Sequence, residues 1–155
     1  MKIIFFQFAL LVIFSALLFA QIPPDRSDLL NGNEGNNGYI AEVNGYPSPK
    51  IVLSLASTLK LTSSQKSKIT DIYNDATARA RQLGKEIVQI ENELYQAFQA
   101  RIINQKSAAD DAQQIGRLRG KLRGVFLTAR IKTRNVLDES QIEMYKKLQG
   151  DIKKK

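Results

Sequence analysis

The sequence predicts an all-α protein: a long antiparallel helical hairpin with short flanking helices, assembled as a homodimer. Between Ile69 and Phe98 the apolar residues recur every three or four positions, which is the spacing of one buried helical stripe. A polar turn at 104–107 separates this stretch from a second amphipathic one. No strand pattern follows residue 50. Because a single hairpin of this length is too thin to enclose a core by itself, we expect a partner copy.

The first 20 residues have the pattern of a secretory signal peptide. A short basic start precedes an apolar run from Ile3 to Phe19, and the small residue Ala20 follows it. Cleavage after Ala20 would release an exported mature protein that begins at Gln21. An uncleaved membrane anchor is the alternative, because the run approaches the ~17–25 residues of a membrane span.

Residues 21–48 are expected to form a flexible linker. The stretch 31–38 is rich in asparagine and glycine, so it has too little apolar surface to offset the entropy lost on ordering. Pro47 and Pro49 mark the C-terminal end of the linker. The helical domain is therefore assigned to 49–150, beginning with a short helix over 51–59. Residues 151–155 form a basic tail.

Three further helices are predicted in this domain. The first runs from about Thr62 to Ile103, with Gly84 as its one weak point. The second runs from about 108 to 136, and the third from about 138 to 149. The apolar stripe of the first helix comprises Ile69, Ile72, Ala76, Ala80, Leu83, Ile87, Ile90, Leu94 and Phe98.

Small residues recur at every fourth position of the second helix. Glycine inside a helix costs about 1 kcal/mol relative to alanine, so three glycines in register need a reason. We expect this stripe to face the first helix, where glycines let two helix axes approach closely. The alternative is a contact between helices of two copies. The close-packing residues are Ala112, Gly116, Gly120 and Gly124.

If the small stripe faces the first helix, a flanking face of the second helix stays free to contact other molecules. This face is apolar and edged by cations, a combination typical of surfaces that bind other polypeptides. It is either the seam of a dimer or a surface for unfolded or amphipathic partners, and one concave dimer could use it for both. Its residues are Ile115, Arg117, Leu118, Arg119, Lys121, Leu122, Arg123, Val125 and Phe126, with Arg130 beyond them.

The composition argues against an enzyme and against a metal site. The chain has no cysteine and no histidine, so it lacks disulfides, the usual general base and the usual transition-metal ligands. We therefore expect no catalytic residues, no cofactor and no metal. With Lys2 set aside, 22 basic residues outweigh 15 acidic ones, which favours acidic partners. Nucleic acid would suit this charge but does not fit an exported protein.

Two similar short motifs open the first and the third of these helices. Each is a capping box, in which a threonine or aspartate side chain accepts a hydrogen bond from a free backbone N–H of the first turn. The glutamine three residues later reaches back to the N–H of the cap residue. The motif residues are Leu61, Thr62 and Gln65 in the first, and Leu137, Asp138 and Gln141 in the second.

This pair of motifs resembles the LTxxQ signature of the Spy/CpxP family of periplasmic chaperones, over roughly residues 50–150. The first motif matches fully, and the second has Asp138 where the family more often has threonine. The resemblance implies a four-helix protomer and an antiparallel, cradle-shaped dimer. It also implies ATP-independent binding of unfolded or misfolded envelope proteins on a basic, partly apolar concave face.

Metal-associated relatives in that family, ZraP and CnrX, resemble this long uninterrupted hairpin more closely than Spy does. Their metal ligands include histidines, which this chain lacks, so metal sensing is discounted. The alternative function is an extracytoplasmic stress-sensing regulator, which would bind a membrane sensor protein such as a sensor kinase, or an anti-sigma factor.

Overall fold

The structure is a computed structural model that describes residues 22–152. These residues form six helices and no strand, so the all-α prediction is confirmed for this part of the chain. The predicted signal peptide over 1–20 lies outside the described residues, as do residues 153–155 of the predicted basic tail. The helices are α1 (Arg26–Asn31), α2 (Tyr39–Val43), α3 (Pro49–Ser54), α4 (Ser63–Gln99), α5 (Gln105–Val136) and α6 (Glu139–Ile152).

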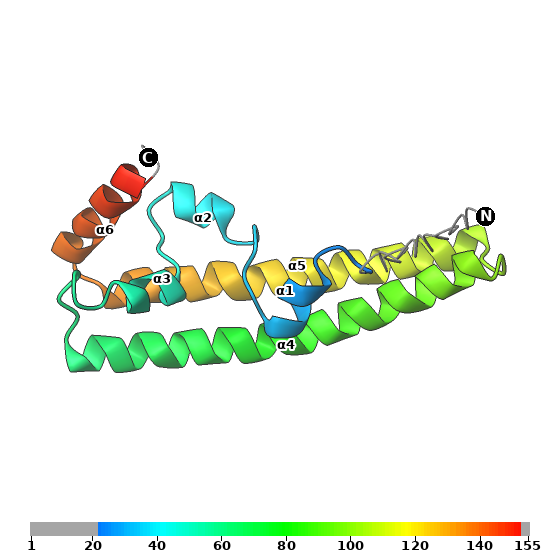
Figure 1. The fold of residues 1–155 in the computed structure, drawn as a ribbon, viewed down its shortest axis with the longest axis horizontal. Coiled ribbons are helices and arrows are strands. Elements are labelled where there is room, and N and C mark those ends of the chain that lie inside the picture. Colours follow the sequence, from blue (N-terminus) through cyan, green and yellow to red (C-terminus); the bar gives the residue numbers. More distant parts are fainter. Residues whose placement is uncertain (1–21, 153–155) are drawn as a thin grey trace, which may run out of the picture.

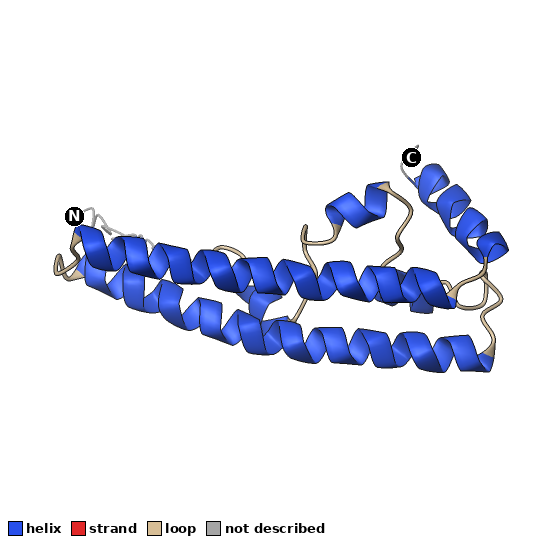
Figure 2. Cartoon of the chain, turned by 180° about the vertical axis from the view of Figure 1, so that it is seen from behind, coloured by secondary structure: helices blue, strands red, loops and turns tan. Residues whose placement is uncertain are grey.

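The two longest helices, α4 and α5, run side by side in opposite directions (Figure 1 and Figure 2). At ~1.5 Å per residue, α4 is about 55 Å long. The turn between them lies at 100–104, not at the predicted 104–107. The reason is a capping box that the sequence reading missed: the Ser107 N–H donates to Asn104 Oδ1 at 3.0 Å, so α5 begins at Gln105.

A first hydrophobic core lies between α4 and α5. Residues of the predicted apolar stripe contribute to this core from the α4 side. The stripe is buried or half-buried from Ile69 to Leu94. Phe98, the last predicted member, is instead 55% exposed, because it lies beyond the core near the free end of the helix pair. The buried residues of this core are Leu29, Ala80, Ile87, Val88, Ile90, Ile115, Leu118, Leu122 and Phe126.

Residues 22–46 form a clasp that crosses the two long helices and carries α1 and α2 (Figure 1). Leu29 of α1 is buried in the first core. Its backbone lies against Gly84 of α4, where an added Cβ would collide with the Leu29 carbonyl group. Gly84, predicted only as a weak point, is therefore where the clasp approaches α4 most closely.

The prediction of a flexible linker over 21–48 is wrong for its described part. Composition correctly indicated little apolar surface, but Leu29 is buried in the first core and Leu30 packs against it, which anchors the segment. Gly32 then turns the chain with a left-handed φ of 67°, and a Cβ there would lie only 2.6 Å from the Thr77 carbonyl oxygen. Ion pairs to α5 hold the remainder.

A second hydrophobic core closes the other end of the helix pair, where α3, α4 and α6 meet. The predicted short helix over 51–59 is α3, which begins earlier, at Pro49, and ends at Ser54. Proline suits this first helical position because its missing N–H would have no partner there. The buried residues of the second core are Val52, Leu59, Ile69, Leu137, Ile142 and Tyr145.

Candidate functional site

Both predicted capping boxes are confirmed. At the start of α4, Gln65 N–H donates to Thr62 Oγ1 at 3.2 Å, and Thr62 N–H donates to Gln65 Oε1 at 3.0 Å. At the start of α6, Gln141 N–H donates to Asp138 Oδ1 at 2.9 Å, and Asp138 N–H donates to Gln141 Oε1 at 3.0 Å. The Ser140 hydroxyl, and then the Gln141 N–H, hold the pKa of Asp138 below its usual range.

The two motifs meet through their glutamines. Gln65 Nε2 donates to Gln141 Oε1 at 2.8 Å, and Gln141 Nε2 donates back to Gln65 Oε1 at 3.1 Å. The second donor of each amide goes to a main-chain carbonyl, Val136 for Gln65 and Leu59 for Gln141. Each amide therefore uses both donors, and each amide oxygen accepts at least two hydrogen bonds. This junction locks the start of α4 to α6, so the motif residues hold the architecture together.

The motif leucines also have structural positions. Leu137 is buried in the second core together with Ile142, the residue at hydrophobic-staple spacing from it. Leu61 is partly buried and packs against the same core. The six motif residues therefore form one continuous structural unit, and binding chemistry must be sought elsewhere on the surface.

The apolar residues predicted as a binding face lie mostly in the first core, which corrects that prediction. Ile115, Leu118, Leu122 and Phe126 are buried there, and Val125 is half-buried. Turning these large side chains toward α4 removes far more apolar area from water than turning glycines would, at about 25 cal/mol per Å². They are therefore part of the fold and unavailable to a partner.

The small stripe of α5 is exposed, contrary to the prediction that it packs against the first helix. Ala112, Gly116, Gly120 and Gly124 are all exposed. A Cβ added at any of these three glycines would meet no neighbouring atom within 4 Å. A repeat of four residues is compatible with either side of a helix, so the pattern could not distinguish the inner face from the outer one.

The predicted cations of α5 divide into two groups. Arg117, Lys121 and Arg123 are exposed, as expected for a solvated face. Arg119 instead binds the clasp: its guanidinium donates to Asp25 at 2.7 and 3.2 Å, and to Glu91 at 3.3 Å. The hydrogen bond from Arg119 holds the pKa of Asp25 below its usual range.

Arg130, predicted to fringe the binding face, is only 5% exposed. Its guanidinium donates to Glu34 at 2.6 Å, to Glu42, and to the Tyr46 carbonyl at 2.7 Å. Burial favours a lower pKa for Arg130, but the bonds and charges of Glu34 and Glu42 outweigh it and raise that pKa. The Tyr145 hydroxyl donates to Glu42 at 3.0 Å, which connects the clasp to α6.

A shallow hollow between α2 and α5 groups exposed apolar side chains from both helices. Its volume is about 580 Å³. Ile40 and Ile131 line it and are 54% and 48% exposed. Leu127 and Tyr46 complete its apolar floor, and Arg134 lies at its edge.

Sequence reasoning missed this hollow for two reasons. Ile40 lies in the segment assigned to a linker, although Tyr39, Ile40 and Val43 have the spacing of one helical face. On α5, Leu127 and Ile131 are four residues apart on the outer face, where only an inner apolar stripe was sought. In both helices the apolar residues have the spacing of one helical face.

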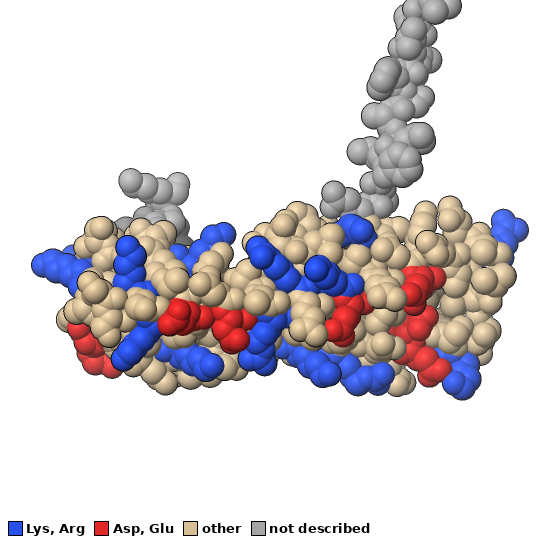
Figure 3. Space-filling view, turned by 90° about the horizontal axis from the view of Figure 1, so that it is seen from below, with Lys and Arg blue, Asp and Glu red and all other residues tan. Residues whose placement is uncertain are grey.

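Charge on the face seen in Figure 3 is mixed: lysine and arginine side chains alternate there with aspartate and glutamate. Within residues 22–152, no three or more Asp or Glu side chains gather as a metal site would need. No helix in this same range is long and apolar enough to cross a membrane.

Comparisons with protein-family models, with curated protein sequences and with solved structures find no match. The likeness to the Spy/CpxP family therefore stays a prediction that rests on the two motifs.

Proposed function

We propose that this protein is a periplasmic, ATP-independent chaperone that binds unfolded or aggregation-prone envelope proteins without catalysis. The observation that carries this proposal is the hollow between α2 and α5, where two isoleucines are about half exposed. Exposed large aliphatic side chains grouped in a depression are typical of surfaces that bind another polypeptide.

Capture of a client and its retention depend on different properties of the protein. With Lys2 set aside, 22 basic residues outweigh 15 acidic ones, and this excess attracts acidic clients over a distance and speeds their encounter. Apolar client side chains then cover Ile40, Leu127 and Ile131, at about 25 cal/mol per Å² of apolar surface removed from water. The hollow is shallow, so each contact is weak and reversible, as holding an unfolded chain requires.

An aggregation assay tests this proposal. The purified protein, at an equimolar ratio and low salt, should suppress light scattering by a heat-denatured client without nucleotide. The Ile40→Ser/Ile131→Ser variant should lose most of that suppression. Met144→Ser is the matched control, because Met144 is 44% exposed but lies outside the hollow. Unchanged scattering with the wild-type protein would contradict the chaperone function itself.

We also propose that two copies pair through the exposed small residues of α5. Glycine at 116, 120 and 124 would let a second helix approach closely, and these positions have open space beside them. Light scattering after size exclusion should give twice the chain mass, and Gly120→Leu should return it to the monomer mass. A monomer at every concentration would remove the dimer and leave the chaperone proposal standing.

A further inference from the structure

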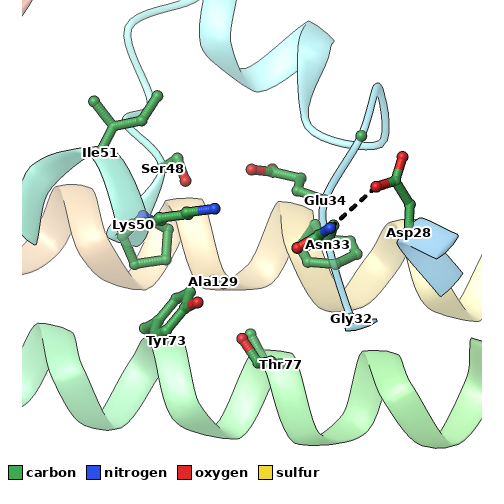
Figure 4. Close-up of a pocket in the computed structure, with 14 residues that line it drawn as sticks. Asp28, Gly32, Asn33, Glu34, Ser48, Lys50, Ile51, Tyr73, Thr77 and Ala129 are labelled. Atoms are coloured by element: carbon green, nitrogen blue, oxygen red, sulfur yellow. Dashed lines mark hydrogen bonds between the residues drawn. The ribbon is translucent and has the colours of Figure 1, made fainter. Parts of the chain in front are cut away.

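A second depression lies between the clasp, the start of α3 and α4, apart from the hollow described above (Figure 4). Its volume is about 340 Å³, which falls within the ~300–1,000 Å³ range of small-molecule sites. Seven polar side chains line it: Asp28, Asn33, Glu34, Ser48, Lys50, Tyr73 and Thr77. They come from three segments far apart in sequence, so the fold brings them together.

Ser48 shows that this depression has hydrogen-bonding capacity that the protein leaves unused. The residue is 5% exposed, yet its side chain makes no cap hydrogen bond to α3. Among the residues drawn in Figure 4, the one hydrogen bond joins Asn33 to Asp28. Ser48 lines the cavity, and Figure 4 shows its side chain beside the open space between the clasp and α4.

The charges in the cavity favour a neutral ligand. Figure 4 shows Lys50 and Glu34 extending into the same space from the side opposite α4. Arg130 is shared by Glu34 and Glu42, so Glu34 keeps part of its negative charge. Asp28 adds a second carboxylate to the lining, and the Lys50 ammonium group supplies the opposite charge. An anionic ligand would approach Glu34 and a cationic ligand would approach Lys50. A hydroxyl group suits both, because it donates to a carboxylate and accepts from an ammonium group.

The opposite side of the cavity adds hydroxyls and an apolar wall. Tyr73 and Thr77 lie one turn apart on α4 and extend upward into the space from below (Figure 4). Phe126 and Ala129 of α5 supply apolar surface beside them. Hydroxyl donors and acceptors around an aromatic wall match a ring that carries hydroxyls at its edge and C–H groups on its face.

We infer that this cavity binds a neutral polyhydroxylated ring of about monosaccharide size. The Ser48, Tyr73 and Thr77 hydroxyls and the Lys50 ammonium group contact its hydroxyls, and the half-buried ring of Tyr73 packs against its apolar face. This site is separate from the hollow between α2 and α5, so it stands independently of the proposed chaperone function.

Titration calorimetry and saturation-transfer NMR of the full-length protein test this inference, with D-glucose, D-galactose and myo-inositol as probes. Thermal shifts are unsuitable, because sugars stabilise proteins without binding them. At least one neutral probe should bind saturably in the millimolar range or tighter. Glucuronate and glucosamine, the charged analogues, should bind more weakly than the neutral probe.

Paired variants assign the binding to this cavity. Tyr73→Phe/Thr77→Val removes two hydroxyls with little change in shape and should weaken binding about tenfold. Tyr95→Phe/Thr128→Val removes the same groups from exposed positions outside the cavity and should bind as the wild type does. The inference is overturned by no saturable binding of any neutral probe, by equal binding in the two double variants, or by a charged analogue that binds more tightly.

Discussion

Gln65 and Gln141 donate hydrogen bonds to each other's side-chain oxygens, at 2.8 and 3.1 Å, although 76 positions separate them in sequence. Each also accepts from the backbone N–H of its own cap residue. The two amides thus form a nearly symmetric junction that fastens α6 to the start of α4. Every donor in this junction has a partner, so the loss of either amide leaves unpaired polar groups behind.

Gln141→Met should therefore destabilise the protein by about 2 kcal/mol, because the Asp138 N–H loses its acceptor and Gln65 loses a partner. Methionine keeps nearly the same shape, so packing is preserved. Urea denaturation followed by circular dichroism measures the change. Gln113→Met, on the exposed face of α5, is the control and should leave the midpoint where it is. Equal midpoints for both variants would show that the junction contributes nothing.

Two glycine substitutions should change stability in opposite directions. At concentrations where the protein is monomeric, Gly120→Ala should stabilise it by about 1 kcal/mol, since alanine is the better helix former and the site has open space within the protomer. Gly84→Ala should destabilise it despite the same helical preference, because the new Cβ collides with the Leu29 carbonyl group. Thermal melts distinguish the two. A stabilised Gly84→Ala variant would mean that the clasp does not rest on α4 in solution.

Removal of Arg130 should release the clasp from α5. Arg130→Met leaves Glu34 and Glu42 without their cation, and breaking a buried pair in this way costs about 3–5 kcal/mol. Amide hydrogen exchange should then rise across residues 22–46 before it rises in α4. Arg117→Met, at an exposed position, should leave exchange in the clasp unchanged. Unaltered clasp exchange in the Arg130 variant would refute this role.

Alkaline pH should weaken the fold through Tyr145. Burial, and then the nearby charge of Glu42, raise the pKa of Tyr145 well above the ~10 of a free tyrosine. Above pH ~10 the unfolded chain loses this proton while the folded chain keeps it, so stability falls as pH rises through that range. Tyr145→Phe should show a shallower decline in melting temperature above pH ~10. The same slope in both proteins would exclude Tyr145 as its source.

The helical architecture was largely predictable from sequence because its signals are local. Apolar spacing located α4, and the cap residues located the starts of α4 and α6. The meeting of Gln65 with Gln141 was not predictable, since a capping pattern describes one helix end and carries no information about its neighbour. A hydrogen bond between side chains that are distant in sequence can be identified only once the fold is known.

The face of α5 and the state of the clasp were predicted wrongly for different physical reasons. On α5, the glycine stripe and the leucine stripe both follow helical spacing, and only the larger apolar area of Leu118 and Leu122 decides which is buried. In the clasp, an average over composition concealed a few specific contacts. Leu29 and the ion pairs of Glu34 and Glu42 suffice to order a segment that is otherwise polar.

The proposed function places unfolded polypeptides in the hollow between α2 and α5. Site-specific photo-crosslinking tests it most directly: a benzoylphenylalanine replaces Ile131 in the hollow, or Met144 outside it, at similar exposure. With a chemically denatured client, the probe at 131 should form a crosslinked product that the native client does not form, and the probe at 144 should form little. Equal crosslinking at both positions, or none at 131, would contradict the account.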